Sequence, residues 1–202
     1  MTSDPRAGRP RAHETVEAAA KEELRERLRT HRQARVRPAA LEAARTARVL
    51  ALSRGHDTVA LYASRNGEPD TWGIIDALAG RGTRVLLPVL RRQPDWGWYH
   101  GRAALRPGWQ AILEPTGPRL GAAALAEASQ VWVSGLAGTP HGDRLGTGGG
   151  WYDRALAWAA PAATIGLLLD DDEVVNWLPT DPWDRPVHLI ATPGRLLRCH
   201  PE

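Results

Sequence analysis

The sequence predicts an α/β protein whose parallel strands are joined by helical crossovers. A buried apolar run at 58–63 (TVALYA) is followed by a helical pattern from Thr71 and by a second apolar run at 83–89 (TRVLLPV). A strand, a helix and a strand within about 30 residues favour a right-handed βαβ unit with parallel strands. Further short apolar runs at 130–133, 163–169 and 187–191 supply more strands. Ligands of such open sheets bind beyond the carboxyl ends of the strands.

Composition favours one globular domain over residues 14–202. Of the 202 residues 43% are hydrophobic and 24% charged, which is ordinary for a chain that buries its own core. Residues 1–13 are rich in Arg, Pro and Gly without periodicity, so we expect a disordered tail. The net charge is only +3 and no basic stripe is interleaved with aromatic residues, so we expect no nucleic-acid partner.

The cellular setting is also expected from composition. No apolar run approaches the ~20 residues needed to span a bilayer, and the first residues lack the apolar core of a signal peptide. The single cysteine, Cys199, fits a reducing compartment. We therefore expect a cytoplasmic protein without a membrane partner, and we expect a monomer.

Two helices are predicted at the amino end, from Glu14 to about Arg35 and from Pro38 to about Ser53. In the first, apolar residues recur every four positions. Lys21, the only lysine among 26 basic residues, and Arg25 are also four apart and share one helical face. Two cations on one face favour either a clamp for a polyphosphate or a solvated face that pairs with the neighbouring glutamates.

A glycine-rich stretch follows the strand at 130–133. Four of the five residues from Gly146 to Gly150 are glycine, and a helix is predicted after them, ending before Pro161. Glycine lets several backbone N–H groups point one way, and a helix N-terminus adds partial positive charge. The stretch is therefore either a mobile turn or an anion site, to which Arg144 adds charge. A carboxylate at Asp153 beside phosphates would need an intervening cation such as magnesium.

Other segments are less regular. The aromatic residues within 91–113 favour either an antiparallel excursion that lines a pocket for a flat ligand or a satellite of the core. We expect a rigid turn at 114–118 and a short helix at 122–128. Asp170–Glu173 is expected to be a solvated turn, because consecutive carboxylates cannot all converge on one ion. Glu68, Asp184 and the glycine stretch all lie on loops that can face one cleft.

Together these residues resemble the 5-formyltetrahydrofolate cyclo-ligase family, also called 5,10-methenyltetrahydrofolate synthetases. The resemblance covers nearly the whole chain, from Lys21 to Pro193. Its parts are Lys21-x-x-Leu24-Arg25, Gly67–Thr71 (GEPDT), Trp109 with Glu114-Pro115, the block from Arg144 to Arg154 (RLGTGGGWYDR), Trp183-Asp184 and Thr192-Pro193. The glycine block, in its order after the Lys/Arg pair, is the most specific part.

The resemblance implies a three-layer α/β sandwich with a mostly parallel central sheet, as in sugar-phosphate isomerases and CoA transferases. It implies an ATP- and Mg²⁺-dependent cyclisation of 5-formyltetrahydrofolate to 5,10-methenyltetrahydrofolate, with a phosphorylated formyl intermediate. It implies catalytic roles for Lys21, Arg144 and Tyr152 and metal binding by Asp153 and Asp184. The implied ATP site comprises Lys21, Arg25, Arg144, Leu145, Gly146, Thr147, Gly148, Gly149, Gly150, Trp151 and Tyr152. The implied folate site comprises Ala63, Glu68, Trp109 and Tyr152.

The chain departs from the family pattern at Ser134, at Gly138-Thr139 and at Thr147, where the family often has a basic residue. These departures leave a second hypothesis open, a diverged folate- or nucleotide-binding protein without catalysis. A third hypothesis is a sugar-phosphate isomerase on a similar fold. That activity needs no ATP, and the sequence offers it no clear general base beyond Glu68.

Overall fold

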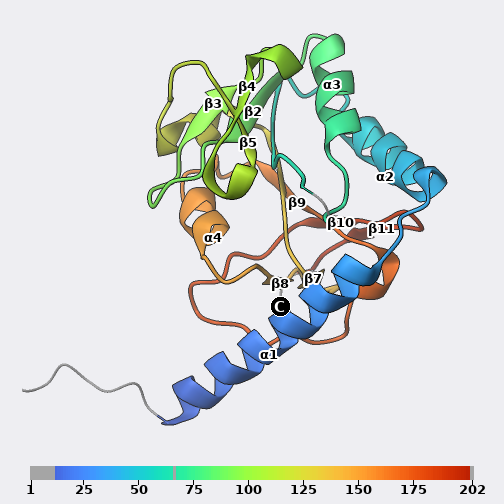
Figure 1. Ribbon diagram of the computed structural model, residues 1–202, viewed down its shortest axis with the longest axis vertical. Helices are drawn as coiled ribbons and strands as arrows, with labels where there is room; N and C mark the ends of the chain where they lie inside the picture. The colour runs from blue at the N-terminus through green and yellow to red at the C-terminus, as the bar shows by residue number, and fades with distance from the viewer. Residues whose placement is uncertain (1–11, 66, 201–202) are drawn as a thin grey trace, which may run out of the picture.

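A seven-stranded mixed sheet forms the centre of the molecule in a computed structural model that describes residues 12–65 and 67–200 (Figure 1). The strand order is β11-β10-β9-β6-β1-β2-β3, in which the five strands from β10 to β2 are parallel and the two edges are antiparallel. The strands are β1 Thr58–Leu61, β2 Arg84–Pro88, β3 Trp96–Trp98, β6 Gln130–Val133, β9 Thr164–Leu168, β10 Leu189–Ala191 and β11 Leu196–Arg198. The predicted α/β class is confirmed, and β11 is an element that the sequence analysis missed.

The central strands are buried on both faces, as continuous apolar runs require. Ala60 faces the core that contains α4, whereas Val59 and Leu61 face the opposite core, because successive side chains alternate across a strand. Trp132 lies across from Gly166 in the parallel pair of β6 and β9. A Cβ on Gly166 would lie 2.4 Å from the Trp132 ring, so this tryptophan needs a glycine beside it.

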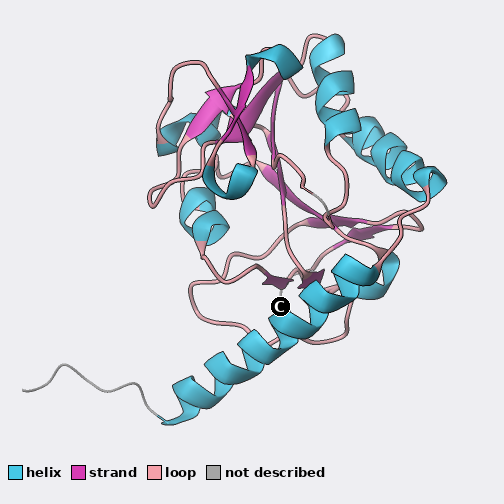
Figure 2. Ribbon diagram, in the orientation of Figure 1, coloured by secondary structure: helices cyan, strands magenta, loops and turns pink. Residues whose placement is uncertain are grey.

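Helices cover both faces of the sheet and make three layers (Figure 2). Helices α2 Ala39–Leu52 and α3 Trp72–Gly80 pack on one face through Val49, Ile74, Ile75 and Leu78. Helix α4 Trp151–Leu156 and the 3-10 helix η3 Ala122–Glu127 pack on the other. The three-layer arrangement implied by the resemblance is therefore present.

Helix α1, Ala12–Ala34, lies apart from these layers, beside the two-residue strands β7 Ala137–Gly138 and β8 Arg144–Leu145 (Figure 1). Leu24 and Leu28 pack against Ala137, Leu145 and Leu178 in a small separate cluster. The apolar residues that recur along this helix thus face the body of the protein. The tail predicted for residues 1–13 falls outside the described residues up to position 11, and α1 begins at Ala12.

A buried ion cluster fastens the carboxyl end of α1 to the turn after β9. We define it as Arg32, Arg35, Arg37 and Arg45 with Glu42, Asp170 and Glu173. The Arg32 guanidinium donates to both Glu173 carboxylate oxygens, at 2.7 and 2.8 Å, and to the Gly135 carbonyl at 2.6 Å. Glu173 is 1% exposed and Asp170 is buried, so the expectation of a solvated turn over Asp170–Glu173 is wrong for these two residues. Asp171 and Asp172 have side chains that are about half exposed, which agrees with the expected solvated turn.

The region 91–113 combines the two predicted alternatives: its strands pair antiparallel, while Trp96 and Tyr99 pack in the core clusters and Trp109 lines a cavity. Strand β3 pairs with β2, and β4 Leu105–Pro107 pairs with β5 Leu113–Pro115 as a separate ribbon. The 3-10 turns η1 Arg102–Ala104 and η2 Trp109–Ala111 connect them. Trp96 is fully buried, whereas Trp109 is 60% exposed. The rigid turn predicted at 114–118 is wrong for its first two residues, because β5 extends to Pro115.

Three further expectations need correction. The helix after the glycines ends at Leu156 rather than near Pro161. The predicted helix at 122–128 is the 3-10 helix η3. The glycine stretch does not follow β6 directly, because the β7–β8 hairpin intervenes.

Helix η4 Asp171–Glu173 completes the list of elements. Among the described residues no helix is long and apolar enough to cross a bilayer.

Candidate functional site

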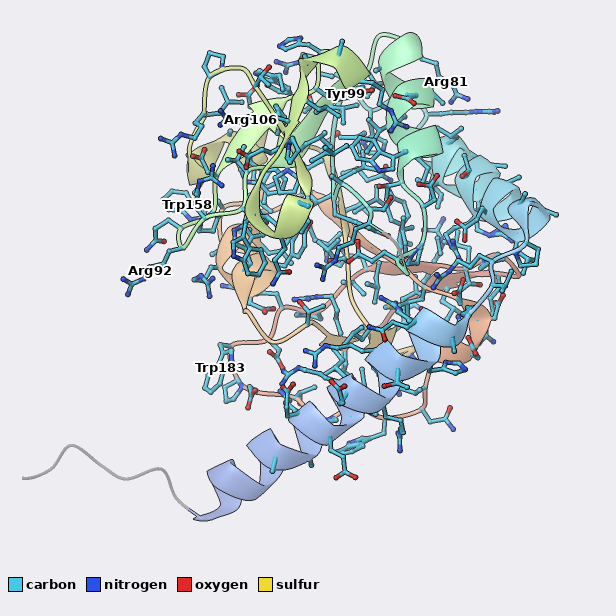
Figure 3. The ribbon with its side chains drawn as sticks, viewed as in Figure 1. Arg81, Arg92, Tyr99, Arg106, Trp158 and Trp183 are labelled. Atoms are coloured by element: carbon cyan, nitrogen blue, oxygen red, sulfur yellow. The ribbon has the colours of Figure 1, made fainter. Side chains whose placement is uncertain are left out.

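A cavity of about 1400 Å³ opens at the carboxyl ends of the parallel strands. The loops after β1, β2 and β6 contribute Glu68, Leu90 and Ser134 to its wall. Helix α1 closes one side, and the β4–β5 ribbon lies at another (Figure 1). In Figure 3, the lining residues Arg92 and Trp183 lie on the side of the molecule that carries α4. The cavity thus lies beyond the strand ends, where ligands of open sheets are expected to bind.

The structure brings the predicted residues together with one exception. The predicted residues that line the cavity are Lys21, Arg25, Glu68, Trp109, Arg144, Leu145, Gly146, Thr147, Gly148, Gly149, Gly150, Trp151, Tyr152, Asp153 and Asp184. Ala63 is not among the lining residues, because it is 4% exposed at the end of β1. Glu68 and Arg65, farther along the same loop, occupy the wall instead.

The face of α1 that carries Lys21 and Arg25 is turned towards the glycine stretch. Lys21 is 6% exposed, and its ammonium donates to Asp184 Oδ2 at 3.0 Å and to Asp181. The Arg25 Nε–H donates to the Gly146 carbonyl at 3.1 Å, while its Nη1 pairs with Glu22 at 3.0 Å. The solvated-face alternative is therefore wrong for Lys21. The pairing with a neighbouring glutamate holds for Arg25.

The stretch from Gly146 to Gly150, which we call the glycine loop, crosses from β8 to α4 without regular structure. Gly148 has φ 103° and Gly150 has φ 59°, in the left-handed region where a Cβ is unfavourable. Helix α4 has only six residues, so its dipole adds little. Charge at this loop comes instead from arginine side chains that approach its backbone.

Arg144 and Asp153 form the centre of the site. Arg144 Nη2 donates to Asp153 Oδ1 at 2.5 Å, and the Arg185 backbone N–H reaches the same oxygen at 3.4 Å. Because Arg185 follows Asp184 directly, the two aspartates predicted to bind metal lie on adjoining parts of the wall. Arg144 Nε, Trp151 Nε1 and Tyr152 Oη are buried without a hydrogen-bond partner within the described structure. Since buried polar atoms are normally paired, these three indicate a polar ligand or ordered water at this wall.

Burial sets the protonation of two groups here. Burial raises the pKa of the Glu68 carboxyl, although the Arg65 backbone N–H, which donates to Glu68 at 3.0 Å, opposes this shift. Burial also raises the pKa of the Tyr152 phenol, and the nearby Glu68 charge adds to the effect. Tyr152 thus remains a neutral hydrogen-bond donor, and Glu68 holds a proton more readily than an exposed carboxyl does.

The cavity wall includes residues that the sequence analysis did not assign. Asp181 pairs with Lys21, and Arg29 brings its guanidinium to the Thr147 carbonyl at 2.8 Å. Arg29 lies eight residues after Lys21, on the same helical face, so this spacing could have predicted Arg29 as a further cation of the site. Arg29 also places a cation beside Thr147, the position at which the family often has a basic residue.

Glu114 organises the far end of the wall. It is 2% exposed and accepts two hydrogen bonds from Arg91 at 3.0 Å each and one from Arg106 at 3.2 Å. A Cβ on Gly108 would lie 2.5 Å from a Glu114 carboxylate oxygen, so this turn needs glycine. Buried and fully paired, Glu114 holds two arginines at the cavity edge.

Comparison with known proteins agrees with this geometry. Residues 17–193 match the 5-formyltetrahydrofolate cyclo-ligase family. A 5-formyltetrahydrofolate cyclo-ligase of Mycolicibacterium smegmatis is 35% identical over 150 residues, which cover 68% of this chain and 74% of the relative. The cyclo-ligase of Escherichia coli K12 is 32% identical over 144 residues, covering 69% and 79%.

A solved structure is also similar. The 5,10-methenyltetrahydrofolate synthetase of Aquifex aeolicus superposes with a TM-score of 0.77 at 27% identity, covering 88% of this chain and 92% of that one. A synthetase of Mycoplasma pneumoniae shares the fold, with a TM-score of 0.67 at 18% identity over 86% of this chain and 98% of that one. The match to the family spans most of the chain, and the relatives agree with it. The chain therefore belongs to the 5-formyltetrahydrofolate cyclo-ligase family.

Proposed function

We propose that this protein uses ATP and Mg²⁺ to cyclise 5-formyltetrahydrofolate to 5,10-methenyltetrahydrofolate, releasing ADP and phosphate. One observation carries the proposal: the cations of α1, the glycine loop and two aspartates line one cavity. Its volume of about 1400 Å³ exceeds the roughly 300–1,000 Å³ usual for one small ligand, so it has room for a nucleotide and a folate together.

Lys21, Arg25 and Arg144 would bind the triphosphate, with the backbone N–H groups of the glycine loop. Lys21 now pairs with Asp181 and Asp184, and Arg144 pairs with Asp153. When a polyphosphate binds, each cation would gain a new anionic partner. The aspartates would then lose their present partners and could bind a metal ion. The pairs are therefore a resting arrangement of charges that nucleotide binding would redistribute.

Asp153 and Asp184 would hold magnesium, which, when bound, neutralises charge on the β- and γ-phosphates. Mg²⁺ commonly uses one or two carboxylates, substrate phosphates and water. Within the described residues no group of three or more acidic, histidine or cysteine side chains could hold a metal by itself. Two aspartates on adjoining parts of one wall fit an ion shared with the nucleotide better than a protein-only site.

Glu68, Tyr152 and Trp109 would meet the folate. Glu68 lies where burial favours its protonated form, so it can exchange hydrogen bonds with the pterin ring. Tyr152 presents a buried hydroxyl with no partner in the described structure, and Trp109 offers an exposed indole to a flat ring. These groups bind and orient the substrate, which phosphoryl transfer needs more than covalent help.

The position of these groups supports a two-step reaction. Lys21, Arg144 and the loop would hold the γ-phosphate in line with the formyl oxygen, which attacks phosphorus as ADP departs. N10 would then attack the activated formyl carbon and close the ring. Phosphate would leave with the electrons of the carbon–oxygen bond and take up the proton that N10 loses. Arg144 and Lys21 would stabilise the charge that develops during transfer.

Of the four departures from the family pattern, Gly138 and Thr139 lie outside the cavity wall, and Ser134 and Thr147 line it. Cβ positions on Gly138 would lie 2.8 Å from Leu167 and 2.9 Å from Ile190, so this glycine serves packing. Thr139 is fully buried and donates to Asp143 at 2.7 Å. Only Ser134 and Thr147 line the cavity, and Arg29 supplies a cation beside Thr147. This supports an active enzyme over the non-catalytic binder.

The test is to incubate the protein with 5-formyltetrahydrofolate, ATP and Mg²⁺ and to follow the near-ultraviolet absorption of the methenyl product together with ADP. We expect both products in equal amounts, and neither without ATP or with EDTA. A folded protein that is stabilised thermally by ATP or formylfolate but releases no ADP would instead be the non-catalytic binder. A cytoplasmic location and a monomeric state also remain proposals, for which fractionation and light scattering are the measurements.

A further inference from the structure

We propose that Arg29 and Arg154 are positioning residues that orient the peptide groups of the glycine loop for an anionic ligand. The inference rests on the proposed function only in naming that anion as the nucleotide triphosphate. Neither residue belongs to the motif positions assigned above to ATP. They come from separate elements, α1 and α4, and donate to the carbonyls of two different loop residues, Thr147 and Gly149.

Three arginines donate to carbonyls of the glycine loop. Arg25 Nε–H reaches the Gly146 carbonyl at 3.1 Å, Arg29 Nη2 reaches the Thr147 carbonyl at 2.8 Å, and Arg154 Nη1 reaches the Gly149 carbonyl at 3.1 Å. Charge-assisted hydrogen bonds of this kind are about twice as strong as neutral ones. Three of the five loop carbonyls are therefore held by guanidinium groups.

Holding a carbonyl also directs an N–H group. The peptide bond is planar and trans, so the C=O of one residue and the N–H of the next point in opposite directions. Guanidinium groups on the carbonyls of Gly146, Thr147 and Gly149 leave the N–H groups of Thr147, Gly148 and Gly150 directed away from these arginines. Across the described chain, none of the backbone N–H groups from 146 to 150 donates to a protein acceptor. The loop thus keeps donors free for a ligand.

The same hydrogen bonds also restrict the conformational freedom of the glycine loop. Glycine loses more conformational freedom on ordering than any other residue, so an untethered run of glycines would remain a mobile turn. Arg29 is itself held by Glu22 at 3.0 Å and Glu26 at 3.2 Å. Its guanidinium is therefore fixed to the helix on one side and fixes the loop on the other, so the loop is ordered before a ligand arrives.

The experiment measures the loop first in the ligand-free full-length protein. Backbone ¹⁵N relaxation gives the order parameters of Gly148, Gly149 and Gly150 in the parent, Arg29→Met and Arg154→Met. Values near 0.85 mark rigid backbone and values under about 0.6 mark flexible backbone. We expect rigid values in the parent and flexible ones in both variants. Arg27→Met is the matched control, because Arg27 is an exposed arginine of the same helix that does not line the cavity.

Titration calorimetry with MgATP follows, with 5-formyltetrahydrofolate titrated separately. We expect the Kd for MgATP to rise about tenfold in each variant and to recover within a few-fold in Arg29→Lys, while the Kd for formylfolate stays within about twofold. Glycine order parameters unchanged in Arg29→Met and Arg154→Met would overturn the proposal, and so would equal losses in Arg27→Met. If the parent fails to bind MgATP while the variants still lose loop order, the positioning role stands and the proposed function falls.

Discussion

Replacing Arg32 by methionine would weaken the joint between α1 and the rest of the molecule. Arg32 is 6% exposed and Glu173 1%, so the substitution removes three charge-assisted hydrogen bonds, two to Glu173 and one to the Gly135 carbonyl, and leaves the Glu173 carboxylate buried without its main partner. Breaking a buried ion pair by removing one partner costs about 3–5 kcal/mol. Arg35 at 3.5 Å and Arg37 at 4.0 Å still partly compensate Glu173. We therefore expect a loss of about 3 kcal/mol in the free energy of unfolding, the low end of that range.

Urea unfolding at pH 7, followed by tryptophan fluorescence, measures this loss for the whole chain. Arg27→Met, which removes the same charge from the exposed face of the same helix, should change stability by less than about 0.5 kcal/mol. Adding Glu173→Gln to Arg32→Met neutralises the stranded carboxylate, so the double variant should recover about 1 kcal/mol or more. A loss under about 1 kcal/mol for Arg32→Met, the value of an exposed pair, would refute the buried character of the cluster.

Three other outcomes are expected. Asp153→Asn and Lys21→Ala should each lower the rate of methenyl formation by at least about 10²-fold, because Lys21 would neutralise phosphate charge directly and Asp153 would do so through the magnesium ion that it holds. Rates within a few-fold of the parent would contradict these roles. Burial would raise the pKa of Asp170, but the Arg35 hydrogen bond and the charges of neighbouring arginines outweigh it and hold the pKa below its usual value. The stability that Asp170 contributes is therefore full above the unfolded pKa of about 3.9 and is lost as pH falls through the lower folded value, so the pH dependence of urea midpoints should flatten below pH 5 in Asp170→Asn. Gly166→Ala should cost more than about 1 kcal/mol, since its Cβ would lie 2.4 Å from the Trp132 ring; a neutral effect on the urea midpoint would argue against this packing.

Much of the architecture could be read from local pattern. The runs around β1, β2, β6, β9 and β10 were predicted because strands buried on both faces are short continuous apolar segments. Helices α1 and α2 were predicted from the helical spacing of their apolar residues, because these residues pack against the rest of the protein. Helix α4 was predicted too long, because the alanine-rich sequence after Leu156 has helical propensity. In the structure this segment forms tighter turns instead, in which the Trp158 N–H donates to the Ala155 carbonyl and the Ala159 N–H to the Leu156 carbonyl.

The site was predicted in its parts and not in its pairings. The glycine loop, Lys21, Arg25, Asp153 and Asp184 carried sequence signals, and all of them line the cavity. Asp181 was missed because nothing in its own neighbourhood shows that an ammonium 160 residues away lies against it. Ala63 was assigned to the folate site through the family resemblance, yet it is 4% exposed and does not line the cavity.

By itself the sequence determined the class of fold, the order of its five parallel strands along the chain, the family resemblance and the two segments that we propose bind a polyphosphate. Periodicity, glycine content and residue spacing are local properties, so one stretch of chain suffices to express them. Only the tertiary structure decided that Asp170 and Glu173 are buried beneath arginines and that Arg29 and Arg154 hold the glycine loop. Desolvation and ion pairing depend on what lies across space, and residues more than a hundred positions apart meet only when the sheet has formed and α1 has packed beside it.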